Sequence, residues 1–180
     1  MRFLNPIQLK FVTSEDTCVS LLGKRRSGKT YTALYTVLYQ MLTKENISVV
    51  YAGPYKTHVD VFFSSLKSIL SELEVEVVKD IKAPYYELRL SNGSRIRGFS
   101  TASGVAAKGQ DADLILLEEA QTIDKLSFMG IFLPMLHSNP KIKIRTIGTF
   151  DESTIADNAL FSSLFIYNNK QIVLPLEGVR

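Results

Sequence analysis

The chain has 180 residues, 46% of them apolar, and this length and composition suit one globular domain with a single buried core. No apolar segment approaches the roughly 20 residues of a membrane-spanning helix, and the first residues lack the long uncharged segment of a secretory signal, so we expect no membrane association. The one cysteine, Cys18, excludes an intrachain disulfide, and a net charge of +3 is too small to indicate nucleic-acid binding by itself.

The first part of the chain predicts two strand–helix units. A short helix is expected at Pro6–Val12, and a strand at Thr17–Leu22 precedes a helix at Lys29–Leu42. A second buried strand at Ile47–Tyr51 precedes apolar residues at helical spacing in Val59–Leu73. This alternation is typical of a sheet whose strands run parallel.

The segment between the first strand and its helix matches the phosphate-loop pattern G-x-x-x-x-G-K-[ST] in full. Its residues are Gly23, Lys24, Arg25, Arg26, Ser27, Gly28, Lys29 and Thr30. Glycines let backbone N–H groups approach phosphates, Lys29 would reach the β and γ phosphates, and Thr30 would ligate Mg²⁺. Because the pattern lies between a strand and a helix, we predict that this loop binds MgATP.

The middle of the chain predicts a β-hairpin that turns at Ser91-Asn92-Gly93. A three-residue loop with a left-handed Gly93 would place Leu88 opposite Ile96 and Glu87 opposite Arg97. A two-residue Asn-Gly loop would shift this register, and we expect the three-residue loop. The strands expected in this region are Glu74–Val78, Tyr85–Leu90 and Arg95–Phe99.

After a loop of small residues, Ser100–Gly109, the apolar strand Leu114–Leu117 ends in two adjacent carboxylates, Glu118 and Glu119. A carboxylate at a strand end can hold the Mg²⁺ shell, and a second one beside it can orient or deprotonate the attacking water. We therefore interpret the pair as a Walker B site, with Glu118 assigned to the metal and Glu119 to the water. Without the phosphate loop, such a pair would more simply be the start of a solvated loop.

A helix is expected near Leu126–Leu136 and a strand at Ile142–Ile147. Lys141, Lys143 and Arg145 alternate along one face of this strand, which we interpret as a sheet edge or rim kept soluble by charge; contact with DNA is the second interpretation. The predicted fold class is α/β: a P-loop NTPase of the ASCE/RecA-like kind, with a mainly parallel central sheet flanked by helices and an added β-hairpin.

Several segments together resemble the ATPase domain of viral DNA-packaging terminase large subunits. These segments are NPIQLKF with Gln8, the phosphate loop, VVYAGPYKTHVDVFFSSL, GVAAKGQDADLILLEEAQ and IRTIGTF. The resemblance implies that Gln8 reads adenine, Arg25 senses the γ phosphate and Thr149 couples hydrolysis to movement. It also implies double-stranded DNA, a portal protein and a small terminase subunit as partners, a homo-oligomeric ring when active, and the host cytoplasm as location.

The chain departs from the family pattern at three places. Glu118 stands where most members have Asp, and Lys108 stands where an arginine often precedes Gly. The role of an activating cation supplied in trans therefore stays open between Lys108, Arg95 and Arg97. The family's nuclease domain has no expected counterpart, since no cluster of acids follows Thr149, and we expect a single ATPase domain over residues 1–180.

Two other functions are compatible with the same residues. A helicase-like or other nucleic-acid remodelling ATPase would share Gln8, the phosphate loop and the acidic pair. A nucleotide-gated binding module with little hydrolysis is suggested by Glu118, whereas Glu119 favours hydrolysis. His58 and His137 are expected to be surface or helix-end residues.

Overall fold

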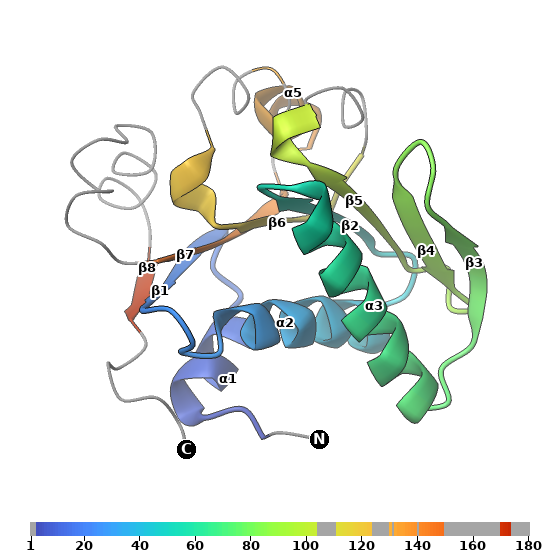
Figure 1. Cartoon of the computed structure of the whole chain (residues 1–180), viewed down its shortest axis with the longest axis horizontal. Coiled ribbons are helices and arrows are strands. Elements are labelled where there is room, and N and C mark those ends of the chain that lie inside the picture. The colour runs from blue at the N-terminus through green and yellow to red at the C-terminus, as the bar shows by residue number, and fades with distance from the viewer. Residues whose placement is uncertain are drawn as a thin grey trace.

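The fold is built on one eight-stranded sheet with the order β3-β4-β5-β2-β6-β7-β1-β8 (Figure 1). A computed structural model describes residues 3–103, 111–123, 130, 132–139, 141–149 and 170–173. In this spatial order, each strand from β5 through β2, β6, β7 and β1 to β8 pairs in parallel with the next. Strand β4 pairs antiparallel with both β3 and β5. The strands are β1 Cys18–Gly23, β2 Ser48–Gly53, β3 Val77–Ile81, β4 Tyr86–Leu90, β5 Arg95–Ser100, β6 Leu114–Glu118, β7 Lys143–Thr149 and β8 Lys170–Val173.

Helices cover both faces of the sheet (Figure 1). One face packs against α1 Pro6–Val12, α2 Lys29–Thr43 and α3 Lys56–Glu72, and the other packs against α5 Leu133–Ser138. Two short 3-10 turns, η1 Thr101–Ser103 and η2 Ala120–Thr122, follow β5 and β6. None of the helices in the described ranges combines the length and the apolarity needed to cross a bilayer. The predicted α/β fold with helices around a mainly parallel sheet is therefore confirmed.

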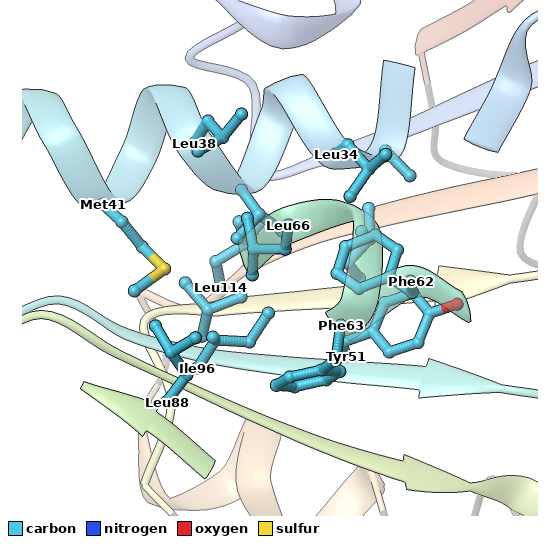
Figure 2. Close-up of a cluster of buried hydrophobic side chains, with 14 of the residues drawn as sticks. Leu34, Leu38, Met41, Tyr51, Phe62, Phe63, Leu66, Leu88, Ile96 and Leu114 are labelled. Atoms are coloured by element: carbon cyan, nitrogen blue, oxygen red, sulfur yellow. The ribbon is translucent and has the colours of Figure 1, made fainter. Parts of the chain in front are cut away.

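Alternation along the strands divides the core into two clusters. Val49 and Leu114 point to the side of α2 and α3, where Figure 2 shows Leu34, Leu66 and their neighbours packed on the sheet. Val50 and Ile115 point to the opposite side, where they join Phe132 and Met135 beside α5. Because both faces are buried, the central strands are continuous apolar segments, as is usual for parallel sheets.

The β-hairpin has the predicted register, with Leu88 opposite Ile96 and Glu87 opposite Arg97. Gly93 has φ +81°, and its N–H donates to the carbonyl of Leu90 at 3.0 Å, which closes the three-residue loop. Glu87 is buried; burial alone would raise its pKa, but hydrogen bonds from Lys79 and Arg97 outweigh this and lower it.

Strand β3 begins later than predicted, at Val77 instead of Glu74. Glu74 has φ +54°, and the N–H of Val75 donates to the carbonyl of Leu70 at 2.9 Å. This is the hydrogen-bond pattern of a Schellman cap. Glu74 and Val75 therefore cap the end of α3, and the strand can begin only after them. Strand β8 was not predicted; it pairs in parallel with β1.

The prediction that Lys141, Lys143 and Arg145 mark a sheet edge is wrong. Strand β7 lies between β6 and β1, and Arg145 is 1% exposed. Its guanidinium donates to the carbonyl oxygens of Ser14 at 2.5 Å and of Asp16 and Ile144 at 2.9 Å. The buried charge is thus satisfied by backbone acceptors. Of the helix predicted near Leu126–Leu136, the structure describes residues 130 and 132 and, from Leu133, helix α5; residues 126–129 and 131 lie outside the described residues.

Candidate nucleotide-binding site

The phosphate loop joins the end of β1 to the start of α2, as predicted. Gly28 has φ +85°, a backbone conformation that side-chain-bearing residues rarely adopt, and it is the N-cap of α2 without a side-chain cap. The first N–H groups of a helix have no partner within the helix, so an uncapped N-terminus of 15-residue α2 can receive an anion. Arg26 is also left-handed, at φ +65°.

Lys29 is buried and folded back on its own loop. Its Nζ atom donates to the carbonyl of Gly23 at 2.9 Å and to that of Lys24 at 2.7 Å. Burial lowers the pKa of the Lys29 ammonium, whereas the carboxylates of Glu119 and Glu118 oppose that shift. The ammonium is therefore held at the floor of the loop, between backbone acceptors and the two acids.

Gln8 lies against this loop although it is 20 residues away from Gly28 in sequence. Its Nε2 atom donates to the carbonyl of Gly28 at 3.4 Å, and its Oε1 atom accepts from the N–H of Asn5 at 3.0 Å in a capping box. The side chain is 5% exposed, so Gln8 is not the plain surface helix residue that its polarity alone would suggest.

The side chains of Thr30 and Glu118 form a hydrogen bond. The hydroxyl of Thr30 donates to Oε1 of Glu118 at 2.5 Å, and Glu118 is the last residue of β6. Hydroxyl and carboxylate oxygens are hard donors of the kind that Mg²⁺ takes, usually through few protein ligands beside phosphates. The two side chains therefore fit the Mg²⁺ of a bound nucleotide.

Glu119 contacts the end of β7. Its Oε2 atom accepts from Thr149 Oγ1 at 3.1 Å and from Gln121 Nε2 at 2.5 Å, and the N–H of Thr149 donates to Gln121 Oε1 at 3.3 Å. Glu119 is left-handed, at φ +49°, where the chain turns from β6 into η2. Two donors on one oxygen fix the direction of the carboxylate.

Most of these groups border one cleft of about 760 Å³, whereas Gln8 and Glu118 do not line it. The lining residues are Arg25, Arg26, Gly28, Lys29, Thr30, Tyr31, His58, Glu119, Gln121, Thr122 and Thr149. The structure thus brings Arg25, Arg26, Lys29, Glu119 and Thr149 of the predicted residues together, but not the side chain of Lys24, and adds His58, which was expected to be a surface or helix-end residue.

The two described candidates for a trans-acting cation, Arg95 and Arg97, do not line this cleft. Arg95 is the first residue of β5 and so lies at the amino-terminal end of the parallel strands, whereas the phosphate loop follows the carboxyl end of β1. Its Nε atom donates to Ser48 Oγ at 3.1 Å. Arg97 pairs with Glu87 at 3.0 Å and lies 5.6 Å from the ring centroid of Tyr85. Lys108 falls outside the described residues.

Sequence reasoning missed two residues beside the acidic pair. Tyr51, in β2, donates its phenol hydrogen to Oε2 of Glu118 and is fully buried. Burial raises the pKa of Tyr51 well above its usual value, and the carboxylates of Glu118 and Glu119 add to this. The signal for Tyr51 is a hydroxyl inside a buried strand, since a buried phenol needs a partner. The signal for Gln121 is its place two residues after Glu119, just beyond the strand end.

No family model matches the chain. Its sequence is 29% identical over 115 residues to the large terminase subunit of Escherichia phage T5, a match that covers 64% of this chain and 24% of that protein. It is 25% identical over 138 residues to the PBSX phage terminase large subunit of Bacillus subtilis (strain 168), covering 75% of the chain and 31% of the relative. The chain thus spans about a quarter to a third of the curated relatives it matches.

The fold is shared with solved large terminases. The large terminase of a thermophilic bacteriophage superposes with a TM-score of 0.77 at 16% identity, over 97% of this chain and 46% of that one. A structure of the same terminase in complex with ADP gives 0.69 at 15% identity, over 94% and 44%. The chain therefore resembles phage large terminase subunits in sequence, and in fold it resembles their ATPase domain, which has the P-loop NTPase fold.

Proposed function

We propose that this chain is an ATP-hydrolysing motor domain that translocates double-stranded viral DNA into a procapsid. The observation that carries the proposal is the hydrogen bond between Glu119 and Thr149, because it joins the acid that would act on water to the end of a neighbouring strand inside the cleft of the phosphate loop. The sequence similarity to large terminase subunits supports the same function.

Binding would begin at the phosphate loop. The N–H groups at the start of α2 receive the phosphates, and the Lys29 ammonium exchanges the carbonyls of Gly23 and Lys24 for the β and γ phosphate oxygens. Thr30 and Glu118 hold Mg²⁺, which would neutralise charge on the phosphates. Gln8 lies beside Gly28 and would read adenine.

Hydrolysis would then depend on Glu119 and Arg25. The carboxylate of Glu119, held through Oε2, orients the attacking water and accepts its proton. Arg25 lines the cleft and can place its planar guanidinium against the γ phosphate, where charge develops.

Coupling would pass through Thr149. A change in charge at Glu119 alters the acceptor that Thr149 bonds, and this biases the end of β7 and the chain that follows. We propose that the motor acts as a homo-oligomeric ring at a portal protein, together with a small terminase subunit, in the cytoplasm of the infected host cell.

Titration calorimetry with ATP and ADP tests the nucleotide site. Lys29→Ala should lose measurable binding, because the ammonium is the phosphate ligand of the motif, whereas Lys141→Ala, at an exposed position that does not line the cleft, should bind within about twofold of the wild type. Wild-type affinity in Lys29→Ala would show that the loop does not bind nucleotide.

Steady-state hydrolysis, with and without double-stranded DNA, tests the chemistry. Glu119→Gln should bind ATP normally but turn over at least about 10²-fold more slowly, because the general base is lost. A larger loss of turnover in Glu118→Gln than in Glu119→Gln would reverse the two assignments. Tight binding with negligible turnover under all conditions would favour a nucleotide-gated binding module.

A further inference from the structure

Both oxygens of Glu118 are engaged by hydroxyl groups from different strands or helices. Oε1 accepts from Thr30 at 2.5 Å, and Oε2 accepts from the phenol of Tyr51. Glu118 is 6% exposed and Tyr51 is 0% exposed, so their contact is shielded from bulk water, whereas Thr30 is an exposed residue. The two donors come from two different elements, α2 and β2.

The sheet register explains why the phenol can reach this acid. Strand β2 lies next to β6, and Tyr51 pairs with Leu116. Side chains two residues apart on a strand share a face, so Glu118 projects to the same side as Tyr51, one step further towards the carboxyl ends. Tyr51 is thus the diagonal neighbour of Glu118.

The ring of Tyr51 is held by α3. It stacks on Phe62 with 3.9 Å between ring centroids and 16° between planes, and Phe63 lies edge-on at 6.4 Å (Figure 2). Beyond the ring, a Cβ atom added at Gly53 would lie 3.2 Å from the phenol oxygen, so the glycine leaves the space that this oxygen needs. Aromatic packing and a close backbone together fix the hydroxyl position.

We infer that Tyr51 is a positioning residue: it occupies Oε2 of Glu118 and thereby turns Oε1 towards Thr30, where the divalent cation of the nucleotide would be held. A glutamate has one more rotatable bond than the aspartate common at this place, and the phenol removes that freedom. The inference rests on the proposed function, because it assigns a role in binding the cation that accompanies ATP.

The test is the Mg²⁺ dependence of ADP binding in Tyr51→Phe, measured by calorimetry at a series of Mg²⁺ concentrations and in EDTA. The substitution keeps the ring and its stacking but removes the donor. Affinity in EDTA should stay within about twofold, whereas the Mg²⁺ concentration for half-maximal tightening should rise about 10- to 100-fold, as is usual when an outer partner of a metal ligand is lost.

Tyr86→Phe is the matched control. Tyr86 is also buried and also donates its phenol to a carboxylate, Asp60, but this pair does not line the cleft. Its removal should leave the Mg²⁺ dependence unchanged. In a double-mutant cycle, Glu118→Asp should weaken the effect of Tyr51→Phe, because the shorter side chain withdraws the carboxylate from the phenol.

An unchanged Mg²⁺ dependence in Tyr51→Phe, with wild-type protein that does respond to Mg²⁺, would overturn the positioning role alone. A wild type that binds no ADP would instead overturn the proposed function. Equal shifts in Tyr51→Phe and Tyr86→Phe would also contradict the inference, because they would show a general effect of removing buried phenols. Urea unfolding of each variant reports any loss of stability separately.

Discussion

Glu119 shows how single contacts set the chemistry of the cleft. The hydroxyl of Thr149 and the amide of Gln121 donate to the same carboxylate oxygen, Oε2, and Gln121 also accepts from the backbone of Thr149. A carboxylate held in this way keeps one direction, which a general base requires, since proton transfer depends on distance and angle. Under the proposed function, Thr149 would therefore orient the catalytic carboxylate as well as couple hydrolysis to movement.

Replacing Thr149 by Val should slow hydrolysis more than it weakens binding. Valine keeps the shape but removes the donor, and a hydrogen bond to a charged group contributes about 1.5–3 kcal/mol, or roughly 10- to 100-fold in kcat. Thr149→Ser should retain most activity because it keeps the hydroxyl. Steady-state kinetics and ADP calorimetry on both variants check this. Equal kcat in the valine and serine variants would contradict the role of the hydroxyl.

The residues predicted from sequence are those whose roles follow from a local pattern. Lys29 and Thr30 are defined by the spacing of one loop, and Glu118 by the end of an apolar strand. Tyr51 could not be paired with Glu118 in advance, because that contact depends on which strands are neighbours in the sheet. Tyr51 and Glu118 are 67 residues apart in sequence, and a contact over such a separation leaves no local pattern that would predict it.

At the scale of elements, strand β7 carries both a residue of the cleft and a residue that holds the segment before β1 in place. Its carboxyl end carries Thr149, in register with Gly23 of β1, and its middle carries the buried Arg145. The guanidinium binds carbonyls of Ser14 and Asp16 and so ties the segment before β1 to β7. Fixing these two strands against each other also fixes the phosphate loop against Thr149.

Arg145→Ala should therefore destabilise the protein, by about 2–4 kcal/mol in urea unfolding, because it leaves buried carbonyls without donors and opens a cavity. Lys141→Ala, at an exposed residue just before the same strand, should change the unfolding free energy by no more than about 0.5 kcal/mol. Similar small effects in both variants would mean that water replaces the guanidinium without cost.

The hairpin and strand β7 show which features of strands a sequence pattern can predict and which it cannot. The register of β4 and β5 followed from one turn, because Gly93 and the pairing of Glu87 with Arg97 are close in sequence. The place of β7 in the sheet depends on pairing with β1 and β6, and alternating basic residues wrongly indicated an edge. Short β8 is likewise defined by its partner strand more than by its own residues.

At the scale of the molecule, strand order assembles the site. Strands β1, β7 and β6 are adjacent and parallel, so their carboxyl ends bring Gly23, Thr149 and Glu118 to one edge of the sheet. Strand β2, on the far side of β6, adds Tyr51. This edge is where ligands bind in open α/β sheets, and the cleft of the phosphate loop lies there.

If the active form is a ring, one subunit should complete the site of the next. The cationic side chains that line the cleft within the described ranges are those of Arg25, Arg26 and Lys29, all from the phosphate loop after β1. An additional cation from a neighbouring subunit would accelerate hydrolysis by about 10³- to 10⁵-fold in related NTPases. Turnover per subunit should therefore rise with protein concentration.

Mixing two inactive variants tests this directly. Lys29→Ala cannot bind nucleotide but keeps any cation that it donates, whereas Lys108→Ala keeps the nucleotide site and lacks one candidate donor; Arg95→Ala and Arg97→Ala serve as parallel variants. Mixed assemblies should recover hydrolysis that neither variant shows alone, because the Lys29→Ala subunit supplies the missing cation to its neighbour's site. The variant that Lys29→Ala rescues identifies the donor. Fast turnover that does not depend on concentration, in a protein that sedimentation shows to be monomeric, would contradict a shared site.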